Sequence, residues 1–153
     1  MTAADALVEF LAARLDEDQV IAQAAVYPAH DGYKPHPEMA AWKYDQDEEV
    51  EYVQTPEMLA HPYPETYYVT CDTEGLTPAV TDDVGPHIAR HDPARVLADV
   101  EGKRRIVSRC DLILRGRAEG MFNEGQVTDA RDNLRALALP YAGHPDYDRA
   151  WAL

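Results

Sequence analysis

The sequence contains few cysteines, few basic residues and no long apolar run. No stretch of about eighteen apolar residues occurs, so no segment is expected to span a membrane. Cys71 and Cys110 lack C-x-x-C spacing, which indicates free thiols rather than a disulfide framework. The segment MTAADALVEF carries acidic residues where a secretory signal peptide has a basic region. We therefore expect a cytoplasmic protein.

The basic residues are also unevenly distributed. The 153 residues include 14 Lys and Arg against 28 Asp and Glu, a formal charge of −14. Residues 1–89 contain 18 acids and 3 bases, a charge of −15, whereas residues 90–153 contain 10 acids and 11 bases, a charge of +1. Because phosphate contacts need Lys and Arg, we expect no binding to nucleic acid. The acidic half instead favours a basic protein partner, or serves only solubility.

Common catalytic motifs are missing as well. The sequence has no glycine-rich phosphate loop, no G-x-S-x-G elbow and no Cys-His nucleophile pattern. The acidic residues of 45–51 lack the glycine that a calcium loop needs for its sharp turn. We therefore favour a non-catalytic protein over an enzyme, and we predict no cofactor.

Three segments have the apolar periodicity of helices. Residues 2–24 begin with a capping pair, Thr2 and Asp5, and continue with an apolar stripe. Asp92 followed by Pro93 predicts a strong helix start, because the carboxylate accepts from free amides and proline at N1 loses no hydrogen bond. This second helix is expected to reach about Leu114. A third helix over 127–137 must end before Pro140.

The middle of the chain has a different composition. Residues 26–86 contain eight of the eleven prolines and seven of the nine tyrosines, which excludes long helices and favours aromatic strands. Residues 42–44 and 50–52 predict a hairpin, and residues 67–71 predict a third strand. We expect one α+β domain over residues 1–153. Its parts are an N-terminal helix, a small antiparallel β-meander, a long central helix and C-terminal helices, in two layers.

The predicted hairpin combines aromatic and acidic side chains. Tyrosine and tryptophan are enriched at interfaces because they give a large contact area with a polar group. The residues predicted to bind a protein partner are Trp42, Tyr44, Asp47, Glu48, Glu49 and Tyr52. The aromatic residues could instead cover the long helix. We expect both uses, with core on one face and an acid-rimmed contact surface on the other.

His87 and His91 have the i,i+4 spacing of zinc-binding pairs. Since Ile88, Ala89 and Arg90 lie between them, the pair lacks the glutamate base of an H-E-x-x-H motif. A weak alternative function is a small metal-dependent enzyme that uses His87, His91 and His144. We favour the interpretation that the two histidines lie at a helix junction and bond to backbone or tyrosine, so we predict no metal.

Both ends of the chain resemble a known family. HIARHDPARVLADVEGKRRIV, followed by LRALALPYAGHPDYDRAW, and the earlier ALVEFLAARLDEDQVIA are similar to an uncharacterised actinobacterial and actinophage family, domain of unknown function 6221. The resemblance covers residues 2–25 and 87–151, and the middle is longer and richer in Pro and Tyr than expected of a member. It implies a phage or mobile-element context and no mechanism. We therefore expect an accessory or interaction protein, and its oligomeric state is left open.

Overall fold

The structure is a computed structural model that describes residues 2–26, 37–44, 50–52, 68–70, 80 and 84–152. The chain divides into two compact units. Unit 1 comprises Met1–Gln19 and Asp99–Leu153, and unit 2 comprises Val20–Ala98. Two long helices contribute residues to both units, and the prediction of a single domain over residues 1–153 stays a prediction.

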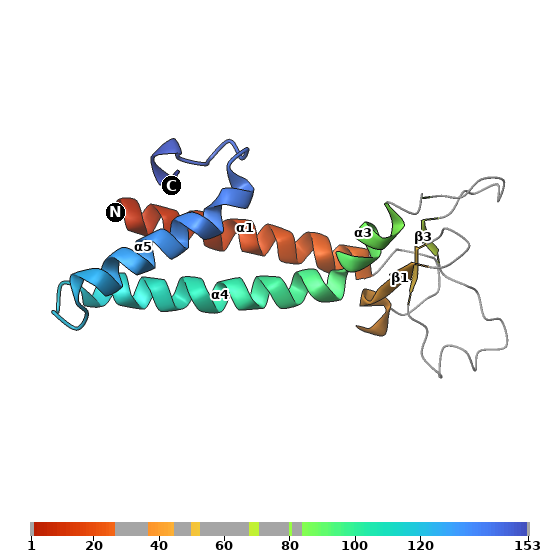
Figure 1. Cartoon of the computed structure of the whole chain (residues 1–153), viewed down its shortest axis with the longest axis horizontal. Helices are drawn as coiled ribbons and strands as arrows, with labels where there is room; N and C mark the ends of the chain where they lie inside the picture. The colour runs from red at the N-terminus through yellow and green to blue at the C-terminus, as the bar shows by residue number, and fades with distance from the viewer. Residues whose placement is uncertain are drawn as a thin grey trace. The chain divides into compact units, whose positions relative to one another are not determined.

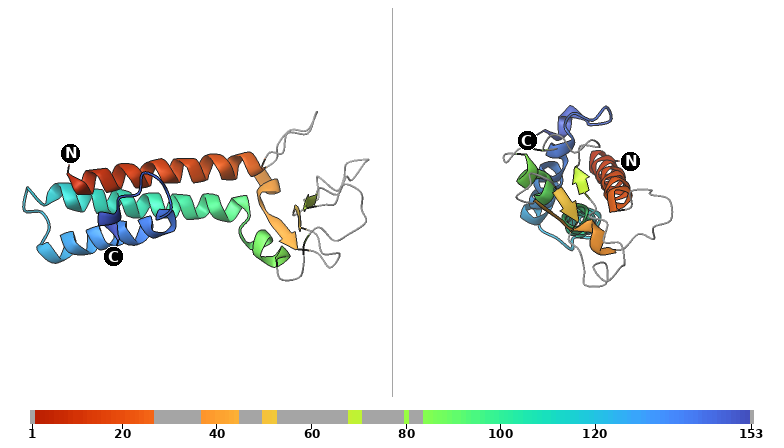
Figure 2. Two further views of the ribbon diagram at one scale, coloured as in Figure 1. Left: turned by 90° about the horizontal axis from the view of Figure 1, so that it is seen from above. Right: turned by 90° about the vertical axis from the view of Figure 1, so that its right-hand side faces the viewer.

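Three long helices form most of unit 1 (Figure 1). They are α1 (Ala3–Val26), α4 (Pro93–Gly116) and α5 (Glu124–Ala138). In this unit α4 runs antiparallel to α1, and α5 runs antiparallel to α4 (Figure 1 and Figure 2). Two short 3-10 turns follow, η2 (Leu139–Tyr141) and η3 (Arg149–Trp151). Within the described ranges, no helix is long and apolar enough to cross a bilayer.

Local capping explains where these helices begin. The Thr2 amide donates to Oδ2 of Asp5 (2.7 Å) and the Asp5 amide donates to Oγ1 of Thr2 (3.2 Å), as the sequence predicts for α1. The hydrogen bond from the Thr2 backbone lowers the pKa of Asp5. Helix α5 begins three residues earlier than predicted, because Asn123 and Gln126 form a capping box that the sequence analysis missed.

The apolar stripes of the three helices meet in a common core. Val100 and Val107 of α4 are buried. The other buried apolar side chains of unit 1 are Leu7, Phe10, Leu11, Leu15, Cys110, Val127, Ala130, Leu134, Ala138 and Trp151. This core leaves only one charged residue buried among the described residues, Arg14.

Unit 2 contains a small sheet and short helical elements. These are η1 (Pro37–Ala40), β1 (Trp42–Tyr44), β2 (Val50–Tyr52), β3 (Tyr68–Thr70) and α3 (Gly85–Arg90). The strands pair antiparallel in the order β1-β2-β3, with Trp42 opposite Tyr52 and a register shift at Val50 and Glu51. Each strand has three residues, so the described chain is dominated by helix. The prediction of an α+β domain therefore overstates the share of the sheet.

Two close contacts fix the elements of unit 2. The Asp92 carboxylate accepts from the Arg95 amide (2.7 Å), which confirms it as the N-cap of α4, and it also accepts from the Trp42 amide of β1 (3.2 Å). Helix α3 packs against β1 at Gly85. A Cβ there would lie 2.1 Å from two ring carbons of Tyr44, so only glycine allows this approach.

Candidate functional site

The structure describes only part of the predicted partner-binding surface. Asp47, Glu48 and Glu49 lie outside the described residues, and so does the side chain of Tyr52. Trp42 and Tyr44 are half-buried on β1, where the indole Nε1 of Trp42 donates to the carbonyl of Met39 (3.2 Å). The aromatic residues of β1 therefore contribute to the packing of unit 2. Binding of a partner by this surface stays a prediction.

His87 and His91 lie close together at the end of α3, with ring centroids 4.4 Å apart. His91 is the C-cap of this helix, and its Nδ1 lies 2.9 Å from the His87 carbonyl. This is the helix-junction arrangement that the sequence analysis favoured. In the part of the chain that the structure describes, no three His, Cys, Asp or Glu side chains gather closely enough to hold a metal ion.

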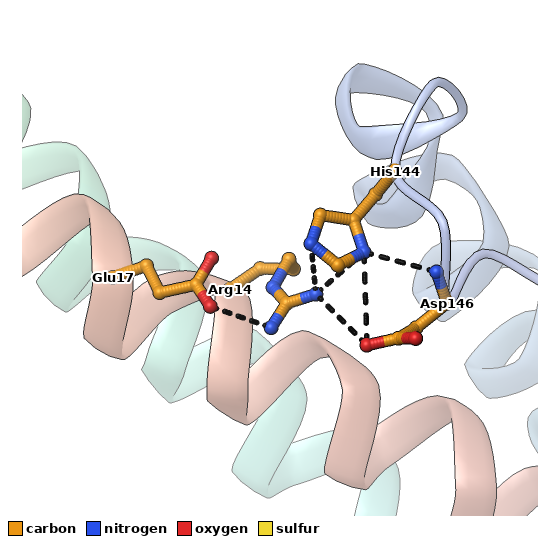
Figure 3. A network of polar contacts seen from close by, with 4 residues as sticks. All are labelled: Arg14, Glu17, His144 and Asp146. Carbon is orange, nitrogen blue, oxygen red and sulfur yellow. Dashed lines mark hydrogen bonds and ion pairs between the residues drawn. The ribbon is translucent and has the colours of Figure 1, made fainter.

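His144 belongs to a different cluster, which surrounds the buried guanidinium of Arg14 on α1 (Figure 3). Nη1 of Arg14 lies 2.7 Å from Nδ1 and 2.6 Å from Nε2 of His144, and 3.7 Å from Oδ2 of Asp146. Nη2 donates to Oε1 of Glu17 (2.7 Å). The guanidinium thus connects α1 to a segment 130 residues later in the chain.

Aromatic rings cover this cation. The Arg14 guanidinium carbon lies 5.3 Å from the centroid of the Phe10 ring, a cation–π distance. The rings around Phe10, all within 6.3 Å of it between centroids, belong to Tyr141, His144, Tyr147 and Trp151. Tyr147 and Trp151 also pack edge to face at 5.7 Å, as their i,i+4 spacing predicts. The segment from η2 to η3 is therefore held on α1 by one cation and a ring cluster.

The Arg14 cluster consists of charged and imidazole side chains. Its polar contacts among the described residues are Glu17, His144 and Asp146, which include no hydroxyl or thiol nucleophile. Two buried atoms near it, Nε of Arg14 and the Tyr147 hydroxyl, lack a hydrogen-bond partner in the described part. An unpaired buried polar group costs about 1–3 kcal/mol, so the surrounding packing has to offset this cost.

Two other ionisable groups of unit 1 are held in their neutral forms. The Tyr141 hydroxyl donates to Oδ2 of Asp18 (2.5 Å), and burial together with this bond raises the pKa of Tyr141. Burial also raises the pKa of the Cys110 thiol, which is free as predicted. A raised pKa disfavours the thiolate, so Cys110 is a poor nucleophile.

A shallow groove of about 360 Å³ lies between α4 and α5, all of it in unit 1. Apolar and small side chains form much of its lining, whereas polar and charged side chains form the remainder. The lining residues are Arg105, Ile106, Arg109, Cys110, Ile113, Gln126, Asp129, Ala130 and Asn133. The sequence analysis missed this groove, although Ile106 and Ile113 widen the apolar stripe of α4 on the side where it opens.

The comparison with protein families gives a match over nearly the whole chain. The model of a family of unknown function, DUF6221, matches residues 4–153. The chain belongs to the DUF6221 family. No curated protein and no solved structure matches it.

Membership of DUF6221 extends the resemblance seen in the sequence. The family match includes residues 26–86, which the sequence analysis had set apart as a departure from the pattern. The family match therefore extends across the Pro- and Tyr-rich middle of the chain. Membership brings no activity with it, so function has to be argued from the chain itself.

Proposed function

We propose that this protein is a non-catalytic interaction protein that binds a basic protein partner through its acidic N-terminal half. The proposal places it in the cytoplasm of a bacterium, in a phage or mobile-element context, as the family resemblance implies. Its oligomeric state is a separate question. The observation that carries the proposal is the separation of charge along the chain.

The charge separation coincides with unit 2. Val20–Ala98 contains 14 acidic and 4 basic residues, a charge of −10, out of the total of −14. Exposed charge of one sign steers an oppositely charged partner and raises its association rate. A basic protein is therefore the partner class whose encounter this unit favours, and nucleic acid is the class that it repels.

In the sequence, the acids at 45 and 47–49 directly follow Trp42 and Tyr44, whose aromatic rings can supply contact area. Trp42 and Tyr44 on β1 are half-buried, so each keeps some surface accessible to solvent. Aromatic anchors surrounded by charged residues are typical of the centre and rim of protein interfaces. Residues 42–49 combine aromatic and acidic side chains in one short stretch of sequence, and this combination supports the proposal.

Fluorescence anisotropy with a labelled Lys- and Arg-rich peptide tests the proposal. The full chain is compared with a triple variant, Asp47→Lys, Glu48→Lys and Glu49→Lys. We expect the affinity of the variant to fall about tenfold, mainly through slower association at low salt. Melting of the variant should match the parent, because the proposal places these three acids in contact with solvent, where substitutions change stability by less than about 0.5 kcal/mol.

The matched control makes the same change of charge in unit 1, through Glu9→Lys, Glu119→Lys and Asp132→Lys. This control should bind the peptide almost as well as the parent. If both triple variants lose affinity equally, binding reflects net charge alone and the proposed surface is wrong. A parent chain that does not bind the peptide at low salt would also contradict the proposal.

A further inference from the structure

The groove between α4 and α5 is an incomplete helix interface. On the adjoining side, about a quarter turn around each helix, they bury Val107, Val127 and Leu134 in the core of unit 1. In the groove, Ile106 keeps 44% of its surface exposed, although Cys110 and Ala130 close the floor beneath it. Helices pack by inserting side-chain ridges into such grooves. Further helices can therefore pack across the open apolar groove between these two antiparallel helices.

Charges of both signs line the two sides of this groove. Arg109 lies on the α4 side and Asp129 on the α5 side. Neither has an ion-pair partner among the described residues, and Arg109 only lies over the Phe122 ring at 5.8 Å. By contrast, Arg105 and Arg115 on the same helix are each paired with an acid one turn earlier. The groove thus presents one free cation and one free anion within the described part.

The antiparallel arrangement places these two charges at the same level. Ile113 lies at the end of the groove near Gln126, and Ile106 lies at the end near Asn133, because α4 and α5 run in opposite directions. Arg109 and Asp129 therefore lie near the middle. A partner surface with only one sign of charge would be attracted by one side and repelled by the other.

We propose that the occupant of this groove is a second copy of the chain. A two-fold axis along the groove places α4 of each copy against α5 of the other. Arg109 of one copy then faces Asp129 of the other, and the symmetry repeats this pair. The isoleucines of both copies meet between the two pairs, which removes the exposed apolar surface from water.

Sedimentation analysis of the full chain from about 1 to about 200 µM, the range expected for a modest interface, tests the dimer. The parent should approach twice its mass of 17.1 kDa. Ile106→Lys should remain monomeric. Leu112→Lys is the matched control, because Leu112 is 50% exposed on the same helix but does not line the groove. This control should dimerise like the parent.

A charge exchange identifies the contact itself. Arg109→Asp alone and Asp129→Arg alone should each weaken self-association by about tenfold or more, since each sets like charges against one another. An equimolar mixture of the two single variants should recover the dimer, because the mixed pair restores both opposite-charge contacts. Circular dichroism checks that every variant keeps its helices. A parent that stays monomeric, a mixture that stays monomeric, or a dimer that survives Ile106→Lys would each overturn the proposal.

Discussion

The two units of this protein are stabilised in different ways. Unit 1 is built from long helices whose buried residues recur every three or four positions, so its core has many equivalent contributors such as Leu11, Val107 and Leu134. The described part of unit 2 has strands of three residues, and single contacts such as the hydrogen bond between Trp42 and Asp92 link its elements. The difference suggests that sequence periodicity encodes unit 1, whereas individual residues encode unit 2.

The largest effect is expected from a charge in the periodic core. Val100→Asp buries a carboxylate at a position that is 3% exposed, which costs several kcal/mol and should prevent folding. The far-ultraviolet circular dichroism of the variant should lack the helical signal of the parent. Ser108→Asp is the control, because Ser108 is exposed on the same helix. A Val100→Asp variant that melts like the parent would show that the core is not where the structure places it.

The next largest effect concerns Arg14, the buried charged residue described in unit 1. Arg14→Ala removes the guanidinium beneath His144 and Asp146 and should cost about 2–4 kcal/mol of unfolding free energy. Arg14→Met keeps most of the packing without the charge. We expect it to lose about 1 kcal/mol or less, because the acids that it leaves without a partner, Glu17 and Asp146, are 55% and 75% exposed and can be hydrated by water. Urea denaturation measures both. If Arg14→Ala and Arg14→Met lose the same free energy of unfolding, the polar contacts of the guanidinium hold the C-terminal segment, and packing against Phe10 does not.

A pair of glycines compares the two units directly. Gly85→Ala in unit 2 forces the Tyr44 ring to move and should cost about 1–3 kcal/mol. Gly102→Ala on α4 adds a methyl group to open space and should stabilise the protein by about 0.5–1 kcal/mol. Thermal melts of the two variants should therefore shift in opposite directions. A shared direction would contradict either the close approach of Tyr44 or the open space at Gly102.

The smallest effect is expected at the start of α4. Asp92→Ala removes a cap and should cost about 1 kcal/mol, whereas Asp92→Asn keeps an acceptor and should cost less. Hydrogen exchange gives the sharper measurement, because the carboxylate accepts from two amides. The amides of Trp42 and Arg95 should both lose protection in the alanine variant. If only the Arg95 amide loses protection, the hydrogen bond from the Trp42 amide to Asp92 does not stabilise β1.

The helices were predictable because their signals are local. Asp92 and Pro93 set the start of α4, and Thr2 with Asp5 set the start of α1, through bonds that span three residues. The start of α5 was predicted less accurately: it was placed near Val127 from the apolar periodicity, whereas Asn123 is the cap. The extent of the sheet was overestimated, since strand length depends on pairing between distant segments.

The site residues were harder to predict because contacts among them span the chain. No residue close to Arg14 in the sequence indicates its contact with His144. The sequence does place Arg14 between the buried positions Leu11 and Leu15, and a charged residue on a buried face needs a polar partner. His144 was considered only as a possible metal ligand, and the structure places it against a cation instead. Ile106 continues the apolar stripe of α4 in the sequence, but its exposure depends on whether another helix covers it.

The discontinuity of unit 1 also affects the order in which the protein can fold during synthesis. Residues 20–98 leave the ribosome as one continuous unit, whereas the unit 1 part of α1 emerges before them and its partners, the unit 1 part of α4 and the whole of α5, emerge after them. At about 5–20 residues per second, the intervening 79 residues take roughly 4–16 s to synthesise. During that time the apolar face of α1, including Leu11 and Leu15, has none of its unit 1 partners to pack against. A nascent chain of this protein should therefore depend on chaperones most strongly before residue 99 is made.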